Sequence, residues 1–204
     1  MNLLVDELPE AVEIDGQEYE INTDFRACLR VILAFEDGEL TNMEKQMIML
    51  QNLYPVQPEN TRAAMEMAVK FLNGGQAADS ESDDKPRLYS FDQDGNFIFA
   101  AFKQTHGVDL ATEPLHWWKF LTLFMDLGAE TTFCSLVGLR KRVKSGKATK
   151  EERKAYREMG DVAELKKLDT RTLEEKERAA EFFRLAEEGR KRREAKKAAS
   201  QSQS

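Results

Sequence analysis

The stretch EPLHWWKFLTLFMDL, residues 113–127, contains the densest group of aromatic side chains in the sequence. Pro114 suits the first turn of a helix and Gly128 suits the position after its end, which predicts a helix from about Glu113 to Leu127. Trp117 and Trp118 are adjacent, so their side chains point about 100° apart around this helix. Either both rings pack in the core, or one packs there while the other contacts a neighbouring element or a partner.

The residues before this helix predict a hairpin followed by three helices. Residues 11–21 alternate apolar and acidic side chains on both sides of Asp15-Gly16, which is typical of a β-hairpin with a tight turn. Asn22, Thr23 or Asp24 can cap a first helix. A second helix opens at a capping box, Thr41 to Glu44, and a third runs from about Glu59 to Leu72.

Three more helices are predicted on either side of the tryptophans. Ile98, Ala101, Phe102 and Thr105 follow helical spacing, and Gly107 ends that pattern. Another helix runs from Glu130 towards Val143, and a capping box from Thr149 to Glu152 opens the next. The fold class predicted is therefore mainly α: a helical globular body with a small N-terminal β-hairpin and a charged C-terminal helical tail.

Two segments lack the apolar residues that a core needs. The first, at 74–87, is acidic and rich in small residues, which predicts a flexible linker. The second is almost entirely charged residues and alanine, and a capping box from Thr172 to Glu175 makes helix plausible there. The predicted organisation is a hairpin with helices at 1–73, the linker at 74–87, a helical region at 88–160 and a charged helical or disordered tail at 161–204.

Composition points to an intracellular protein without a membrane segment. Hydrophobic residues make up 41% of the 204 residues, and no apolar run reaches the roughly 18 residues that span a bilayer. The first ten residues carry acids where a secretory signal carries bases. Cys28 and Cys134 lie far apart in apolar surroundings, which suits reduced thiols in a core.

Charge is distributed unevenly along the chain. Residues 1–100 contain 20 acids and 7 bases, a balance of −13, and the remainder contains 17 acids and 23 bases, a balance of +6. This asymmetry predicts charge-complementary partners or self-association. The bases gather at Arg140, Lys141, Arg142 and Lys144 and again over 190–197. They read either as solvated helix ends or as a nucleic-acid surface, and the interspersed acids favour the former.

A calcium-like spacing at Asp92, Asp94 and Asn96 does not describe a calcium site. The sixth position of that loop should be glycine and is Phe97, and the twelfth should be glutamate and is Lys103. Asp94 or Asn96 is better interpreted as the cap of the helix that follows.

No pattern for catalysis or for a cofactor is recognisable. His106 and His116 have no third ligand at metal-binding spacing and no paired nucleophile. Glycine-rich phosphate loops are missing from the sequence as well. We therefore expect a protein that is not an enzyme, binds no cofactor or metal, and acts through its surfaces.

Several flexible or aromatic side chains are candidates for such a surface. Methionine adapts to irregular apolar partners, and it recurs on the second and third predicted helices. Core packing is the alternative role for these methionines. The candidate client-binding residues are Trp117, Trp118, Met43, Met47, Phe182 and Phe183.

The ordered combination of motifs resembles a family of small proteins from tailed bacteriophages of Gram-positive hosts. The motifs that carry the resemblance are LP and VEIDG at 8–16, INTDFR at 21–26, IFAAF at 98–102, GVDL at 107–110 and LHWWKF at 115–120. The last is the most specific, and the likeness covers roughly residues 3–160. Members are encoded among the tail genes, just before the tape-measure protein.

The resemblance implies a tail assembly chaperone. Such a protein would bind the tape-measure protein in the host cytoplasm, with the major tail tube protein as a second expected partner, and it would be absent from the mature virion. The family implies no catalytic residues. The alternatives are a minor structural or tail-completion protein of the virion, which purified particles would contain, and a nucleic-acid-binding regulator, whose affinity would fall steeply with salt.

Overall fold

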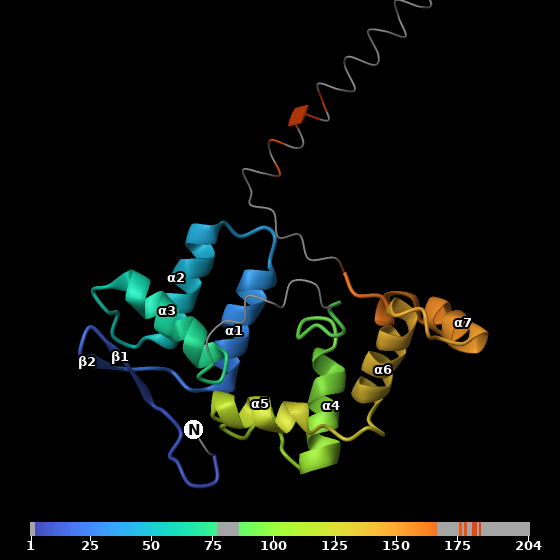
Figure 1. The fold of residues 1–204 in the computed structure, drawn as a ribbon, viewed down its shortest axis with the longest axis horizontal. Helices are drawn as coiled ribbons and strands as arrows, with labels where there is room; N and C mark the ends of the chain where they lie inside the picture. Colours follow the sequence, from blue (N-terminus) through green and yellow to red (C-terminus); the bar gives the residue numbers. More distant parts are fainter. Residues whose placement is uncertain are drawn as a thin grey trace, which may run out of the picture.

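A computed structural model describes residues 3–76 and 86–166, together with Lys176, Arg178, Glu181, Phe182 and Arg184. Over these residues the chain forms seven α-helices and one two-stranded antiparallel sheet, which confirms the predicted mainly α class with a small N-terminal β-hairpin. Most of the predicted charged tail at 161–204 lies outside the described residues. Figure 1 shows the hairpin and α1–α3 at one end, α6 and α7 at the other, and α5 lying along the base between them. The predicted capping box at 172–175, Phe183 and most of the predicted linker lie outside the described residues.

The N-terminal half follows its sequence signals closely. Strands β1 (Ala11–Ile14) and β2 (Gln17–Glu20) pair through a turn in which Asp15 and Gly16 both have positive φ, as the Asp-Gly pair predicts. The three helices that follow begin at side-chain caps provided by an aspartate, a threonine and an asparagine: α1 (Phe25–Glu36), α2 (Asn42–Leu53) and α3 (Thr61–Leu72).

The described residues of the second half form four α-helices and one short 3-10 helix. They are α4 (Gly95–His106), α5 (Trp117–Met125), α6 (Thr132–Lys144), α7 (Lys150–Met159) and η2 (Gly160–Val162). The capping box from Thr149 to Glu152 and the left-handed Gly107 after α4 are confirmed.

The helix predicted from Glu113 begins four residues later, at Trp117. His116 occupies the N-cap position, where its ring accepts a hydrogen bond from the backbone N–H of Trp118. The preceding residues form a turn instead, in which the N–H of Glu113 donates to the carbonyl of Asp109 at 2.9 Å. A histidine acting as cap was the unrecognised signal, since Pro114 alone had suggested the earlier start.

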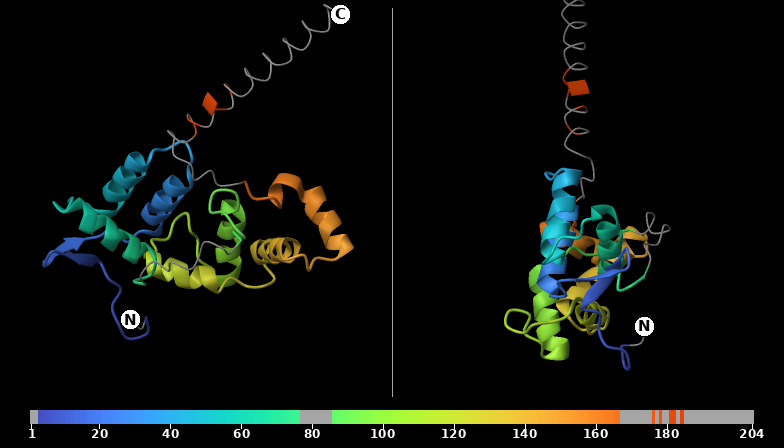
Figure 2. Two further views of the ribbon diagram at one scale, coloured as in Figure 1. Left: turned by 45° about the horizontal axis from the view of Figure 1, so that its top comes forward. Right: turned by 90° about the vertical axis from the view of Figure 1, so that its left-hand side faces the viewer.

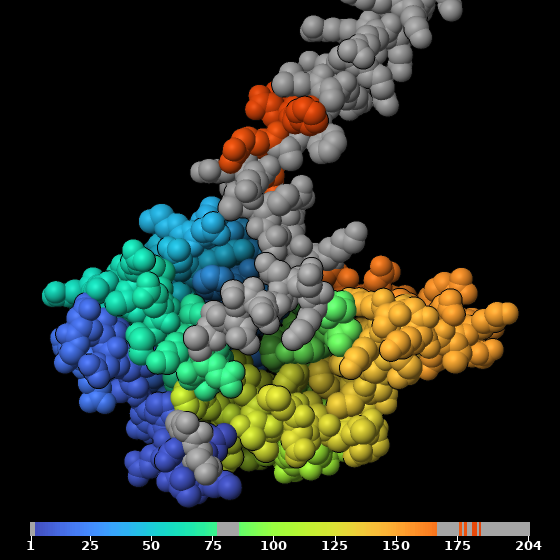
Figure 3. Space-filling model, viewed as in Figure 1, coloured from blue at the N-terminus to red at the C-terminus, as the bar shows by residue number. Residues whose placement is uncertain are grey.

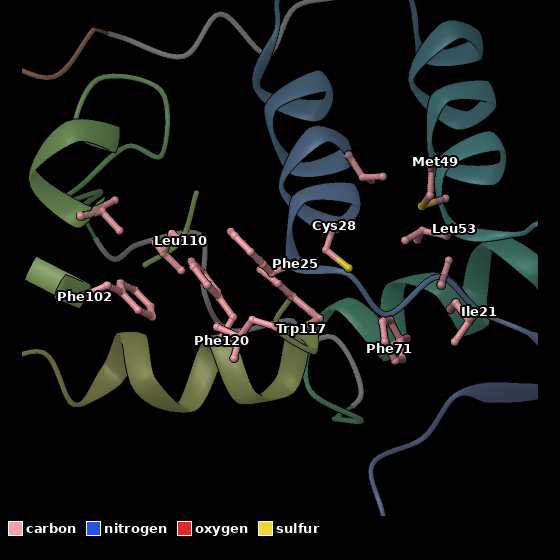
Figure 4. Packing of buried hydrophobic residues seen from close by; sticks show 14 of the residues in the cluster. Ile21, Phe25, Cys28, Met49, Leu53, Phe71, Phe102, Leu110, Trp117 and Phe120 are labelled. Atoms are coloured by element: carbon pink, nitrogen blue, oxygen red, sulfur yellow. The ribbon is translucent and has the colours of Figure 1, made fainter. Parts of the chain in front are cut away.

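One hydrophobic core joins the residues before and after the predicted linker. Its centre is Phe120, whose ring stacks on Phe25 with centroids 5.0 Å apart and on Phe102 at 4.9 Å. Trp117 stacks on the same phenylalanine at 5.4 Å. Figure 4 shows these rings converging from α1, α4 and α5, with Cys28 beside them. The aromatic side chains of the 113–127 stretch therefore unite the two halves.

A buried ion pair connects α4 with α6. Arg140 and Asp94 are 0% and 1% exposed, and their side chains are joined by two hydrogen bonds of 2.7 and 2.9 Å. The guanidinium also donates to three backbone carbonyls, those of Leu88, Val162 and Ala163. We call this group the ion-pair junction.

Two predictions, for Asp94 as a helix cap and for Arg140 as a surface base, differ from what the ion-pair junction shows. Asp94 stands at the N-cap position of α4, but its carboxylate makes no capping bond there, because it is occupied by Arg140 and by the backbone N–H of Ser90. Arg140 was grouped with surface bases and is instead fully buried. In the described part of the chain, no helix is long and apolar enough to cross a membrane.

Candidate functional site

The two tryptophans of the LHWWKF motif close the C-terminal end of α3. The indole N–H of Trp117 donates to the carbonyl of Leu72 at 2.9 Å, and that of Trp118 donates to the carbonyl of Phe71 at 2.8 Å. The last carbonyls of a helix have no partner within the helix, so these bonds supply two of the donors that α3 needs. The pair thus performs a structural task that its helical spacing did not reveal.

His116 fixes the start of α5 through both ring nitrogens. Nδ1 accepts the N–H of Trp118 at 3.0 Å, and Nε2 lies 3.0 Å from the carbonyl of Pro9, to which it must donate. This arrangement requires the neutral imidazole with its proton on Nε2. The backbone on either side pairs with the entry to α1, since Trp117 N–H donates to Thr23 and Phe25 N–H donates to Leu115.

The motif therefore connects α5 with α1, α3 and α4. We call its four residues His116, Trp117, Trp118 and Phe120 the aromatic junction. Trp117 is 1% exposed, so its ring belongs to the core and offers no surface to a partner in this conformation. Trp118 is partly buried against Phe71 and lies over Gly75, where an added Cβ would stand 2.8 Å from the ring. Of the two tryptophans predicted to bind a client, only Trp118 is partly exposed.

The methionines of α2 and α3 separate into two groups. Met43 and Met47 are 71% and 48% exposed on the outer side of α2. Met49 is buried, and Met65 and Met67 on α3 are partly buried against the core. Neither Met43 nor Met47 belongs to the packed cluster that contains Trp117 and Trp118.

An open apolar groove of about 630 Å³ crosses the outer faces of α1, α2 and α3. We call it the methionine groove. Phe35 from α1 and Val69 from α3 stand at its surface, 45% and 38% exposed. Its apolar lining consists of Phe35, Met49, Met65, Met67 and Val69.

Four polar side chains share the lining of the methionine groove, and two of them are paired with each other. Arg62 forms an exposed ion pair with Glu66 one helical turn away, and Gln46 and Lys70 complete the lining. Next to the groove, the ammonium group of Lys45 is buried and donates to the carbonyl of Phe35 at 3.1 Å. That bond satisfies one of the last carbonyls of α1 and fixes the backbone that presents Phe35.

The sequence pointed to methionines on the second and third helices but did not indicate Phe35 or Val69. A signal for Val69 was present, because α3 carries two apolar stripes. One stripe, Ala64, Ala68 and Phe71, is buried in the core. The other, Met65 and Val69 at i and i+4, lines the methionine groove, and a second apolar stripe of this kind indicates a binding face.

The remaining candidates add no chemical site. Phe182 is 68% exposed in the tail, and Phe183 lies outside the described residues. His106 ends α4, and its Nε2 lies 2.9 Å from the carbonyl of Leu123. Within the described ranges no group of three His, Cys, Asp or Glu side chains could hold a metal ion. The described residues do form one open, mainly apolar surface, the methionine groove.

Comparison with known proteins identified one family. A family model described as "Bacteriophage Gp15 protein" matches residues 4–165, which include every described helix except the tail residues. Neither the search of curated proteins nor the search of solved structures gave a match.

Proposed function

Because the chain belongs to the bacteriophage Gp15 protein family, we propose that it is a tail assembly chaperone for the tape-measure protein. In this role it binds helical segments of the tape-measure protein and keeps them soluble until the tail tube polymerises around them. It acts in the host cytoplasm without catalysing a reaction, and it leaves before the virion is complete.

The methionine groove is the observation that supports this proposal. An amphipathic helix binds by laying its apolar side chains into a groove of this type, with anchors at i, i+3, i+4 and i+7. The groove has two large apolar groups at its surface and three methionines in its lining. Methionine side chains are unbranched and polarisable, so they adapt to anchors of different shape. A chaperone that meets many segments of one long client needs that adaptability.

The position of the methionine groove also suits a reversible contact. Its exposed residues stand on helices whose opposite faces are buried, so the groove can bind and release a client while the core stays intact. The whole chain carries a formal net charge of −7, which helps to keep a complex with an apolar client in solution.

Co-expression with the tape-measure protein tests the proposal. We expect the soluble fraction of the client to rise several-fold with the native chain and to fall back with Phe35→Ser or Val69→Glu, because each places a polar group in the groove. The quantity measured is client in the supernatant after centrifugation. Unchanged client solubility with the native chain would refute the chaperone role.

Matched controls are available on other helices. Phe99 on α4 is 40% exposed and Val162 in η2 is 46% exposed, close to the values for Phe35 and Val69. Phe99→Ser and Val162→Glu should therefore keep full activity if the groove is the binding surface. Mass spectrometry of purified particles separates the alternative role, because a minor virion component would be present at fixed stoichiometry.

A further inference from the structure

The helical hairpin formed by α6 and α7 carries a concentrated positive charge. Residues 141–159 contain 8 Lys or Arg and 3 Glu, a balance of +5. Two of the glutamates are already paired within the hairpin, Glu152 with Arg142 at 2.8 Å and Glu158 with Lys154 at 3.7 Å. Figure 3 shows this hairpin protruding from one end of the molecule. Its cations therefore face solvent on a projecting element.

A hollow of about 540 Å³ lies between the two helices of this hairpin. Its lining combines cations with apolar surface: Lys150, Arg153 and Arg157 beside Val143 and Tyr156. Arg153 is used internally, where it donates to the carbonyl of Ala148 at 2.8 Å. Lys150 and Arg157 have no ion-pair partner among the described residues. We call this site the basic hollow.

The opposite end of the molecule carries the complementary charge. Residues 11–20, which form the β-hairpin at that end, contain four acids and no Lys, Arg or His. In the β-hairpin, Glu13 and Glu18 are direct cross-strand neighbours, and both are exposed. Like charges directly opposite each other destabilise a strand pair, and no cation of the described chain pairs with either carboxylate. The outer face of this hairpin is therefore an unpartnered anionic surface.

The two surfaces lie at opposite ends of the long axis, as both Figure 1 and Figure 2 show. One copy cannot bring its own β-hairpin to its own basic hollow, but each copy supplies both halves of the contact. We propose that copies of this chain associate head to tail, with the outer face of the β-hairpin of one copy, at Glu13 and Glu18, bound to the basic hollow of the next.

The geometry of this contact makes it heterologous. Two different patches meet, so a copy bound at one end keeps the other end available, and association continues until a ring closes or a filament grows. The contact is mainly electrostatic, and Tyr156 and Val143 of the basic hollow provide apolar surface beneath the β-hairpin of the bound copy. It does not use the methionine groove, so it is independent of the proposed chaperone activity.

Sedimentation velocity of the full chain over a range of concentrations tests the proposal. At about 0.1 M NaCl the Debye length is about 10 Å, and at about 1 M it is about 3 Å. We expect concentration-dependent assemblies at the lower salt and a dissociation constant at least about tenfold weaker at the higher salt. A chain that stays monomeric at low salt, or an assembly indifferent to salt, would overturn the proposal.

Charge exchange identifies the two surfaces. Glu13→Lys/Glu18→Lys and Lys150→Glu/Arg157→Glu should each abolish association, and an equimolar mixture of the two variants should restore it, because the altered surfaces complement each other. The control Lys103→Glu/Lys119→Glu changes two exposed cations on α4 and α5 and should associate normally. Thermal unfolding by circular dichroism verifies that each variant folds. Association that survives both exchanges, or a monomer whose basic hollow binds duplex DNA instead, contradicts the proposal.

Discussion

The aromatic junction and the ion-pair junction join the parts of this molecule by opposite physical means. At the aromatic junction, Phe120 is surrounded by rings from α1, α4 and α5, and each contact contributes a modest amount. At the ion-pair junction, one guanidinium binds one carboxylate and three carbonyls with no water-exposed alternative. Substitutions at the aromatic junction should each lower the stability of the fold by a modest amount. At the ion-pair junction, loss of the arginine alone should remove most of the stabilisation at once.

The largest expected effect is at Arg140. Arg140→Met leaves the carboxylate of Asp94 buried without its cation, which should lower the free energy of unfolding by about 3–5 kcal/mol. Adding Asp94→Leu removes the stranded charge, but the carbonyls of Leu88, Val162 and Ala163 still lack donors. The double variant should therefore recover only part of the loss, as measured by urea denaturation.

A control for the arginine lies two residues away. Arg142 pairs with Glu152 at the surface, with exposed fractions of 48% and 29%. Arg142→Met should change the free energy of unfolding by less than about 1 kcal/mol. Equal effects at the two arginines would show that burial does not distinguish them.

The tryptophans allow a finer test at the aromatic junction. Trp117→Phe removes the indole donor that the carbonyl of Leu72 receives, and the described chain offers that carbonyl no other donor. Trp118→Phe costs less, because the carbonyl of Phe71 also accepts the N–H of Gly74 at 3.0 Å. We expect losses of about 2 and about 1 kcal/mol in the free energy of unfolding. A reversed order would place the main role of the pair elsewhere than at the end of α3.

The smallest change is expected in thiol chemistry. Burial raises the pKa of Cys28 from 9.0 to about 12, so almost no reactive thiolate forms at pH 8. Cys134 on α6 is only partly buried. Maleimide should therefore label Cys134 and leave Cys28 unmodified in the native protein, and should label both after denaturation. Rapid native labelling at Cys28 would show that the core near Phe25 opens readily.

Signals from residues close in sequence predicted the helices and strands better than the tertiary contacts between them. The Asp15-Gly16 turn, the Thr41 and Thr149 capping boxes and the stop at Gly107 depend on residues close in sequence, and all are present in the structure. His116 broke this rule because its ring acts as a cap, which moved the start of α5 from Glu113 to Trp117.

The wrong prediction for Arg140 shows the limit of inference from neighbouring residues in the sequence. It stands at i+7 of the stripe Phe133, Leu136 and Val137, so its position on α6 already favoured burial. The three bases around it suggested a solvated helix end instead. Its partner Asp94 is 46 residues away, and no local pattern indicated that pairing.

Most helices, the β-hairpin, most of the caps and the uneven charge follow from the amino-acid sequence alone, because they depend on composition and on the spacing of a few residues. The packing of the whole fold is what places Trp117 in the core and leaves Trp118 partly exposed. It also decided that Asp94 holds Arg140, and that Phe35 joins Met65 and Val69 in one groove. Such pairings depend on which helix faces pack together, and that choice is made by the whole core rather than by any segment.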